Sequence, residues 1–357
     1  MLDGLKEGLF PRLRYLDFHT TCLHPDCSML FITSRLAHLR ITSIALHWDK
    51  VQQLLRTLVD LASPQLLSLN LSAPEVGPPA LILLSQLYSL HELSVHEVVA
   101  GDGTNTLLEA LRRLWNMPSI VKLVLYVHSS VITLRSPARG FPPHEALPIV
   151  SEQLYCGNLS ALCTLLQLAP PARDLCISPK PYPTLEDWNR TIEAAFRRPA
   201  LHALRIGQEA EQLRSYPAAI MLQMPRFEEL TVLCISVGLD WTDHVVDHVA
   251  RSCPAATHID LLERSGSNFR TFQALTCQAI VSFAMHCKRL QTLSIAIPSA
   301  SEPSSSSVAD LPLDLEPNTS LVELDLCQRL SGRETHGRHK PLVTLLKTLF
   351  QNLVTLK

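Results

Sequence analysis

The 357-residue sequence is poor in charge and in glycine, and each shortage excludes a class of function. Only 18% of the residues are charged, against about 25% in an average soluble protein. Lys and Arg (31) nearly balance Asp and Glu (33), so no overall field draws the protein onto nucleic acid. The 12 glycines form no phosphate-binding loop, and the nearest pattern, at 101–105, lacks the G-K-[ST] ending of a P-loop. We therefore expect no nucleic-acid partner and no cofactor.

The sequence also lacks a secretory signal, a membrane span and a disulfide framework. Its N-terminus has no apolar run long enough for a signal peptide. The longest charge-free stretch, 154–172, contains Pro170 and Pro171 and polar residues that would be costly in lipid. The 10 cysteines are spread without tight pairing, which favours free thiols in a reducing compartment. We expect a cytoplasmic or nuclear protein that makes no contact with a membrane.

What the sequence has in excess is leucine, and the leucines repeat. Of the 357 residues 65 are leucine, and a phrase of the form apolar-x-x-apolar-x-apolar recurs along the whole chain. Successive copies begin 23 to 34 residues apart, except for one interval of 52, close to two periods, in which Leu159 and Leu162 suggest a degenerate copy. The clear copies begin at Leu13, Leu36, Leu66, Leu90, Ile120, Ala172, Leu201, Phe227, Ala256, Leu290 and Leu321, and a further one at Leu353. This regularity indicates a repeat protein.

Between the phrases the apolar spacing changes from that of a strand to that of a helix. Val51–Ala62 places its apolar residues on one helical face, and Thr184 followed by Asp187 indicates a helix start. The other expected helices are 80–87, 106–115, 184–197, 211–223, 242–251, 271–286 and 341–351. A helix between strands is the crossover that parallel pairing requires. The predicted fold is α/β: one solenoid (horseshoe) of about 12 irregular repeats over 1–357, with strands on the concave face and helices on the convex face.

The phrase and its period resemble leucine-rich repeats, in the longer form in which a helix backs each strand. Cys253-Pro254 and Cys287, each just before a strand phrase, are similar to the cysteine-containing repeats of F-box/leucine-rich-repeat proteins. The proline-led style, as in Phe10-Pro11-Arg12-Leu13, is similar to the C-terminal half of many fungal F-box proteins. That resemblance implies repeats that hold a substrate, while an N-terminal F-box contacts the adaptor of a cullin-type ubiquitin ligase.

The sequence departs from the resembled family in two ways. The Asn or Cys at the ninth motif position is replaced, for example by Thr21 and Pro74, so a regular asparagine ladder there is absent. No F-box precedes the first phrase at Leu13. Contact with a ligase adaptor would therefore run through an F-box that is missing from this sequence.

Two segments fit no repeat. Residues 135–148 are rich in proline and predict a loop. Residues 298–320 replace a helix with serine, proline and acid, which is too poor in large apolar groups to offset the entropy of ordering. We expect a flexible insertion there.

The sequence offers little for catalysis. It has no G-x-S-x-G elbow and no cysteine or serine with an evident base. His244 and His248, one helical turn apart, could share a zinc ion, but the neighbouring valines indicate an ordinary half-buried helix whose histidines face water. We expect a protein that is not an enzyme, with a zinc-dependent hydrolase as the least favoured alternative.

The remaining candidate is the concave face. In each phrase the apolar side chains point into the core between strands and helices. The residues on either side of the second apolar position therefore point to the concave face. Tyr and Arg are the types that most often anchor protein interfaces. We predict partner binding by Tyr15, Asp17, His38, Arg40, Asn70, Glu92, Lys122, Tyr126, Arg205, Glu229 and Asp260. The predicted function is recognition of a protein substrate in a ubiquitin ligase; the alternative is a free-standing scaffold or regulator without ligase contact.

Overall fold

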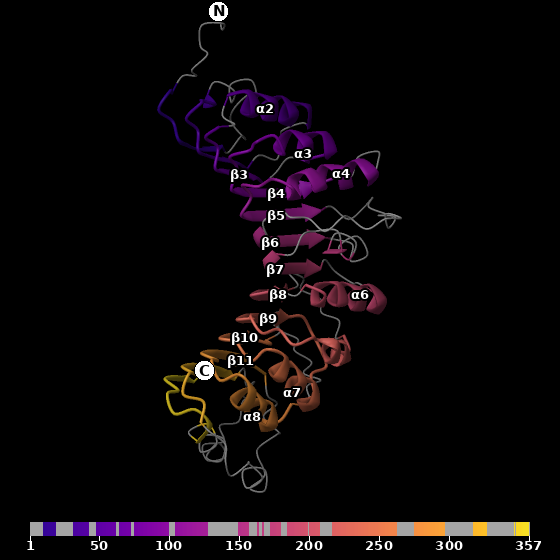
Figure 1. The fold of residues 1–357 in the computed structure, drawn as a ribbon, viewed down its shortest axis with the longest axis vertical. Helices are drawn as coiled ribbons and strands as arrows, with labels where there is room; N and C mark the ends of the chain where they lie inside the picture. Colours follow the sequence, from indigo (N-terminus) through magenta and orange to yellow (C-terminus); the bar gives the residue numbers. More distant parts are fainter. Residues whose placement is uncertain are drawn as a thin grey trace, which may run out of the picture. The chain divides into compact units, whose positions relative to one another are not determined.

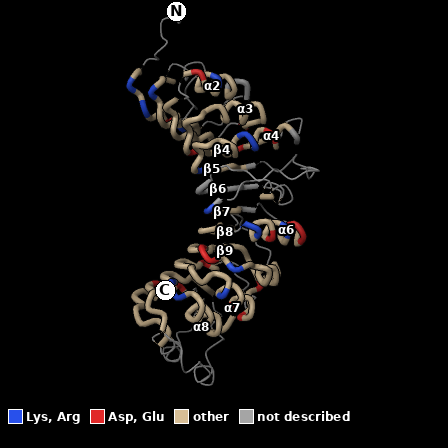
Figure 2. Tube along the Cα trace, in the orientation of Figure 1, with Lys and Arg blue, Asp and Glu red and all other residues tan. Residues whose placement is uncertain are grey.

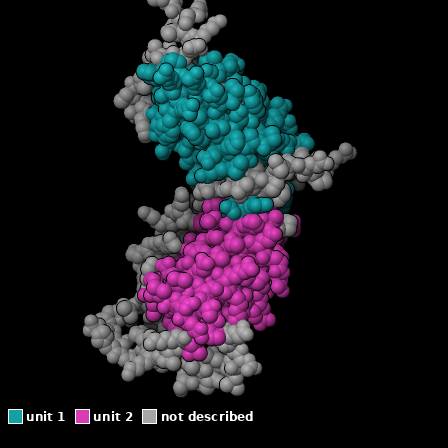
Figure 3. All heavy atoms as spheres, turned by 60° about the vertical axis from the view of Figure 1, so that its left-hand side comes forward, with its two compact units in different colours: residues 1–175 teal, residues 176–357 magenta. Residues whose placement is uncertain are grey.

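The computed structural model divides into two compact units, Met1–Leu175 and Cys176–Lys357 (Figure 3). The described residues are 10–18, 31–42, 48–61, 64–72, 75–99, 104–127, 149–156, 163, 166–167, 172–179, 184–198, 200–207, 216–262, 275–296, 317–326, 346 and 348–356. The proline-rich segment 135–148 lies outside them.

Unit 1 is a stack of parallel strands in sequence order with helices on one side of the sheet (Figure 1). Its strands are β1 (Tyr15–Phe18), β2 (His38–Ile41), β3 (Ser68–Leu71), β4 (Glu92–Val98), β5 (Lys122–Val127) and β6 (Ile149–Cys156). Its described helices are α2 (Trp48–Leu61), α3 (Pro78–Leu84) and α4 (Thr104–Trp115). Strand β7 (Ala172–Pro179) includes the boundary between the units.

Unit 2 repeats the same arrangement. Its strands are β8 (Ala203–Gly207), β9 (Val232–Ser236), β10 (His258–Asp260), β11 (Thr292–Ile295), β12 (Glu323–Leu326) and β13 (Thr355–Leu356), again parallel and in sequence order. Its described helices are α6 (Leu185–Phe196), the 3-10 helix η3 (Ala218–Gln223), α7 (Asp243–Ser252) and α8 (Cys277–His286). The predicted α/β repeat fold, with parallel strands alternating with helices, is confirmed.

The repeat phrase supplies the core. Leu36, Leu39 and Ile41 of the second copy are at most 2% exposed. Val51 and Leu55, on the apolar face of α2, are also buried. Burying one such side chain fully contributes about 1.5–3 kcal/mol. Because every repeat buries only one face, stability comes from stacking on the neighbours.

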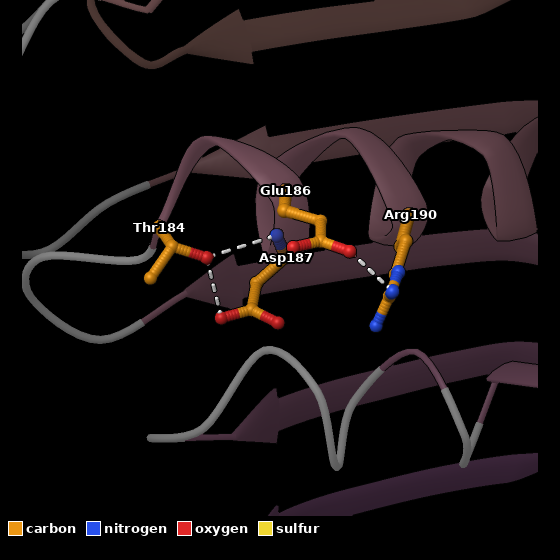
Figure 4. Close-up of polar contacts among 4 residues, drawn as sticks. All are labelled: Thr184, Glu186, Asp187 and Arg190. Carbon is orange, nitrogen blue, oxygen red and sulfur yellow. Dashed lines mark hydrogen bonds and ion pairs between the residues drawn. The ribbon is translucent and has the colours of Figure 1, made fainter.

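Helix α6 shows how the sequence sets a boundary (Figure 4). Thr184 has extended backbone angles, and its Oγ1 accepts a hydrogen bond of 3.1 Å from the Asp187 backbone N–H. The same hydroxyl donates to Asp187 Oδ2 at 2.7 Å, and Arg190 pairs with Glu186 one turn on. The predicted helix start is confirmed. None of the helices in the described ranges is long and apolar enough to cross a bilayer.

Two details of the expected fold are wrong, and a third falls mostly outside the described residues. The strand of the degenerate copy is β6, and not a segment at Leu159 and Leu162. Its phrase is hard to recognise in the sequence because Glu152 stands where other copies have an apolar residue, opposite Leu123. The helix expected at 211–223 is η3, since Pro217 has no backbone N–H for a helix interior. Of the expected insertion, 298–316 lie outside the described residues. Residues 317–320 are described, and Asn318 there is buried and bonded to the preceding repeat.

Buried polar side chains at one repeat position tie neighbouring repeats of unit 2 together. Cys287 Sγ lies 3.4 Å from the carbonyl oxygens of both Cys253 and Ala250. In the next repeat Asn318 Nδ2 donates to the Cys287 carbonyl at 2.9 Å. Burial raises the pKa of the Cys287 thiol to about 12, so the sulfur keeps the hydrogen that it shares with these carbonyls. Burial, together with Cys287 nearby, also raises the pKa of Cys253 well above its ordinary value.

Candidate interaction surface

The face of the unit 1 sheet opposite the helices carries most of the predicted binding residues. We call it the open face, and it corresponds to the face predicted as concave. Leu39, Leu69, Leu93 and Leu123, at the centres of β2–β5, are buried. Side chains alternate along a strand, so the residues just before and just after each of these leucines form two rows on the opposite face of the sheet. The first row is Tyr15, His38, Ser68, Glu92 and Lys122; the second is Asp17, Arg40, Asn70, Ser94 and Val124. Seven predicted site residues therefore lie on neighbouring strands in register.

Neighbours within these rows contact one another. Arg40 Nη1 lies 3.9 Å from Asp17 Oδ2, and the rings of Tyr15 and His38 have centroids 6.2 Å apart. Ser68 Oγ donates to Glu92 Oε2 at 3.4 Å. Cross-strand pairs of this kind each contribute about 0.2–1 kcal/mol. They hold the side chains in place but leave Tyr15 61% exposed.

A third position along the strands forms an aromatic stack. The rings of His96 in β4 and Tyr126 in β5 lie 4.5 Å apart at 13°. Burial, and secondarily the positive charge of Arg40, lowers the pKa of His96 below its ordinary 6.5. The imidazole is therefore neutral at neutral pH. The sequence points to Tyr126, but only the register shows that His96 is its partner.

The charge of Arg40 makes the protonation of His96 testable. Arg40→Gln should raise the pKa of His96 toward 6.5 but leave it below, because burial is the larger cause. A side-chain NMR titration of the two proteins measures both values. As the pH falls through 6.5, the imidazole of His96 is protonated in the unfolded chain before it is protonated in the folded protein. Protonation of His96 therefore lowers the stability of the fold. An unchanged pKa in the variant would contradict the electrostatic contact across the open face.

Unit 2 brings together fewer of the predicted residues. Arg205 in β8 is exposed and shares a row with Cys234 and Asp260. Asp260, however, is only 4% exposed, and its Oδ1 accepts a hydrogen bond of 3.1 Å from the Leu262 N–H. The expectation that Asp260 lies on an accessible face is wrong, because its carboxylate closes the turn after β10.

The placement of Glu229 on a strand is also wrong. Leu233 and Ile235 of β9 pair with Leu204 and Ile206 of β8, so the phrase of this repeat begins at Leu230 and not at Phe227. Glu229 therefore precedes the strand and pairs with His202, whose Nε2 lies 2.8 Å from Glu229 Oε2. Side chains of β9 on the open side are those of Val232 and Cys234 instead.

Of the two histidines considered for zinc, His244 is exposed and His248 has another partner. His248 Nε2 lies 3.1 Å from the Met224 carbonyl, which requires that this nitrogen carry a hydrogen. Asp243 accepts from the backbone N–H of Thr276 at 2.9 Å, and Asp247 accepts from Ser282 Oγ at 3.0 Å. These carboxylates join α7 to α8. In the described parts of the chain, no group of three His, Cys, Asp or Glu side chains is placed to hold a metal.

Comparison with solved structures gives likenesses of fold. No family profile matches the sequence, and no curated protein matches it either. An internalin crystal structure from Listeria monocytogenes aligns with 91% of this chain and 68% of its own, at 12% identity and a TM-score of 0.40. The assignment of the leucine-rich-repeat fold here follows from the strand order and the buried phrases described above.

Proposed function

We propose that the chain is a protein-binding module that does no chemistry and contacts its partner through the open face of unit 1. The observation that carries the proposal is the row-by-row register of exposed aromatic and charged side chains over β1–β5. Tyr and Arg anchor many interfaces, and Tyr15 and Arg40 lie in adjacent strands. The mixture of Asp17 and Glu92 with Arg40 and Lys122 favours a partner of mixed charge, because such a face repels molecules of neither sign.

Site-specific photo-crosslinking tests this proposal. A benzoylphenylalanine in place of Tyr15 should crosslink a partner protein, while the same group in place of Leu61, exposed at the end of α2, should not. The double variant Arg40→Glu/Lys122→Glu should abolish the Tyr15 crosslink. Equal crosslinking from both positions, or a crosslink that survives the double variant, would show that the open face is not the binding surface.

Within this function, the favoured setting is substrate recognition for a cullin-type ubiquitin ligase. What supports it is the pair Cys253 and Cys287, which occupy the same position ahead of successive strands and on which the resemblance to F-box/leucine-rich-repeat proteins rests. Cys253, Cys277 and Cys287 are reduced thiols, which agrees with a cytoplasmic or nuclear protein. The whole gene product should copurify with the adaptor and cullin. A product that binds its partner but recovers neither would instead be a free-standing scaffold or regulator.

A further inference from the structure

A second surface of unit 1 lies where the chain turns into each strand. The turns 11–14, 34–37, 64–67, 88–91 and 118–121 occupy equivalent positions ahead of β1–β5. Backbone hydrogen bonds of 2.7–2.9 Å link one to the next, from the N–H of residues 37, 67, 91 and 121 to the carbonyls of 14, 37, 67 and 91. We call this strip the turn edge. It is distinct from the open face because its residues precede the strands.

The turn edge is positively charged at its β1–β2 end. Arg12 and Arg35 occupy the same position in adjacent turns, and Arg14 lies two residues beyond Arg12; all three are exposed. The described residues provide no ion pair for any of them, and the nearby Asp17 pairs with Arg40. None of the five turns contains an aspartate or glutamate. Figure 2 shows Lys and Arg gathered at this N-terminal end of the unit.

Two like charges on adjacent repeats repel each other. Neighbouring strands are about 4.8 Å apart. The Arg12 and Arg35 positions are therefore close enough for a single acidic partner to neutralise both charges. Guanidinium groups also suit carboxylates, which they can bind through two parallel hydrogen bonds.

The other end of the turn edge is apolar. Leu67 is 40% exposed, Tyr88 60% and Val121 43%. Leu67 and Val121 are the equivalents of Arg14 in their own turns, with the exposed His91 between them. The strip therefore passes from guanidinium groups to a mainly apolar end.

We propose that the turn edge binds an extended, acidic peptide segment of a partner protein, with carboxylates on Arg12, Arg14 and Arg35 and apolar side chains over Leu67 and Val121. Five turns at about 4.8 Å span about 19 Å, the length of about six extended residues. A membrane is the less suitable occupant. Leu67 and Val121 are more than half buried in the protein, whereas surface-bound helices insert their apolar side chains about 5–10 Å into the lipid.

Fluorescence anisotropy with the whole chain tests the proposal. The probe is a fluorescein-labelled peptide of about eight residues in which glutamate alternates with leucine. Arg12→Glu/Arg35→Glu should weaken its binding at least about tenfold, and added salt should weaken the wild-type complex. The matched control is Arg289→Glu, because Arg289 is exposed at the same turn position in unit 2; it should change the affinity by less than about twofold.

Three results would overturn the proposal. One is equal binding of a peptide with glutamine in place of glutamate. Another is an equal loss of peptide affinity in Arg12→Glu/Arg35→Glu and in Arg289→Glu. The third is an absence of peptide binding together with binding to phosphatidylserine vesicles that Arg12→Glu/Arg35→Glu abolishes, which would assign the strip to a membrane. Circular dichroism of each variant shows whether it is folded. The open face is unchanged in all of them, so this outcome is separate from the crosslinking result at Tyr15.

Discussion

Replacement of Leu204 by aspartate should destabilise unit 2 by more than about 4 kcal/mol. Leu204 is fully buried at the centre of β8 and pairs in register with the equally buried Leu233 of β9. An aspartate there would place a carboxylate between stacked leucines with no group of opposite charge in the row. Loss of the leucine would also leave a cavity, which by itself costs about 2–5 kcal/mol.

Urea unfolding followed by hydrogen exchange of the β8 and β9 segments measures this effect. Hydrogen exchange is the sharper measurement, because stability in a repeat protein varies along the stack. Arg205→Asp is the matched control, since it introduces the same side chain at the exposed neighbouring position and should cost less than about 1 kcal/mol. Similar losses in the two variants would contradict the alternation of buried and exposed side chains in β8.

The repeat period predicts the fold because each phrase must bury the same face. A one-residue shift in a strand would move all its leucines to the solvent side, so the apolar pattern fixes the register. The same reasoning explains why the apolar pattern places one phrase three residues too early. Phe227-Leu230-Val232 and Leu230-Leu233-Ile235 are overlapping apolar triplets three residues apart, and the period alone accepts either. The pairing with β8 selects the second.

The open face is predictable where the strands are regular and unpredictable where they end. Tyr15 and Arg40 follow directly from the alternation, and the structure places both as expected. Asp260 has the same position within its phrase, yet it is buried because a backbone N–H two residues later needs an acceptor. The stack of His96 on Tyr126 depends on cross-strand register at the ends of β4 and β5, which neither residue type nor spacing reveals.

Asn318 gives the second large effect: Asn318→Ala should cost about 2–4 kcal/mol. The side chain is 1% exposed. Its Nδ2 donates to the Cys287 carbonyl at 2.9 Å, and its Oδ1 accepts from the N–H groups of Ser320 at 2.9 Å and Leu321 at 3.2 Å. Alanine can replace none of these bonds, so buried backbone groups of two repeats would be left without partners. Faster hydrogen exchange in β11 and β12 is the expected readout.

Two further variants separate the hydrogen bonds of Asn318 from simple loss of volume. Asn352 donates to the Thr319 carbonyl at 2.7 Å but is exposed, so water can replace it and Asn352→Ala should cost less than about 1 kcal/mol. Asn318→Cys should fall between wild type and Asn318→Ala, because cysteine is the residue at this position in the preceding repeat, where Cys287 reaches the Cys253 carbonyl. A thiol restores one weak donor but no acceptor for the two N–H groups. If Asn318→Cys were no more stable than Asn318→Ala, the contact between repeats would not depend on a donor at this position.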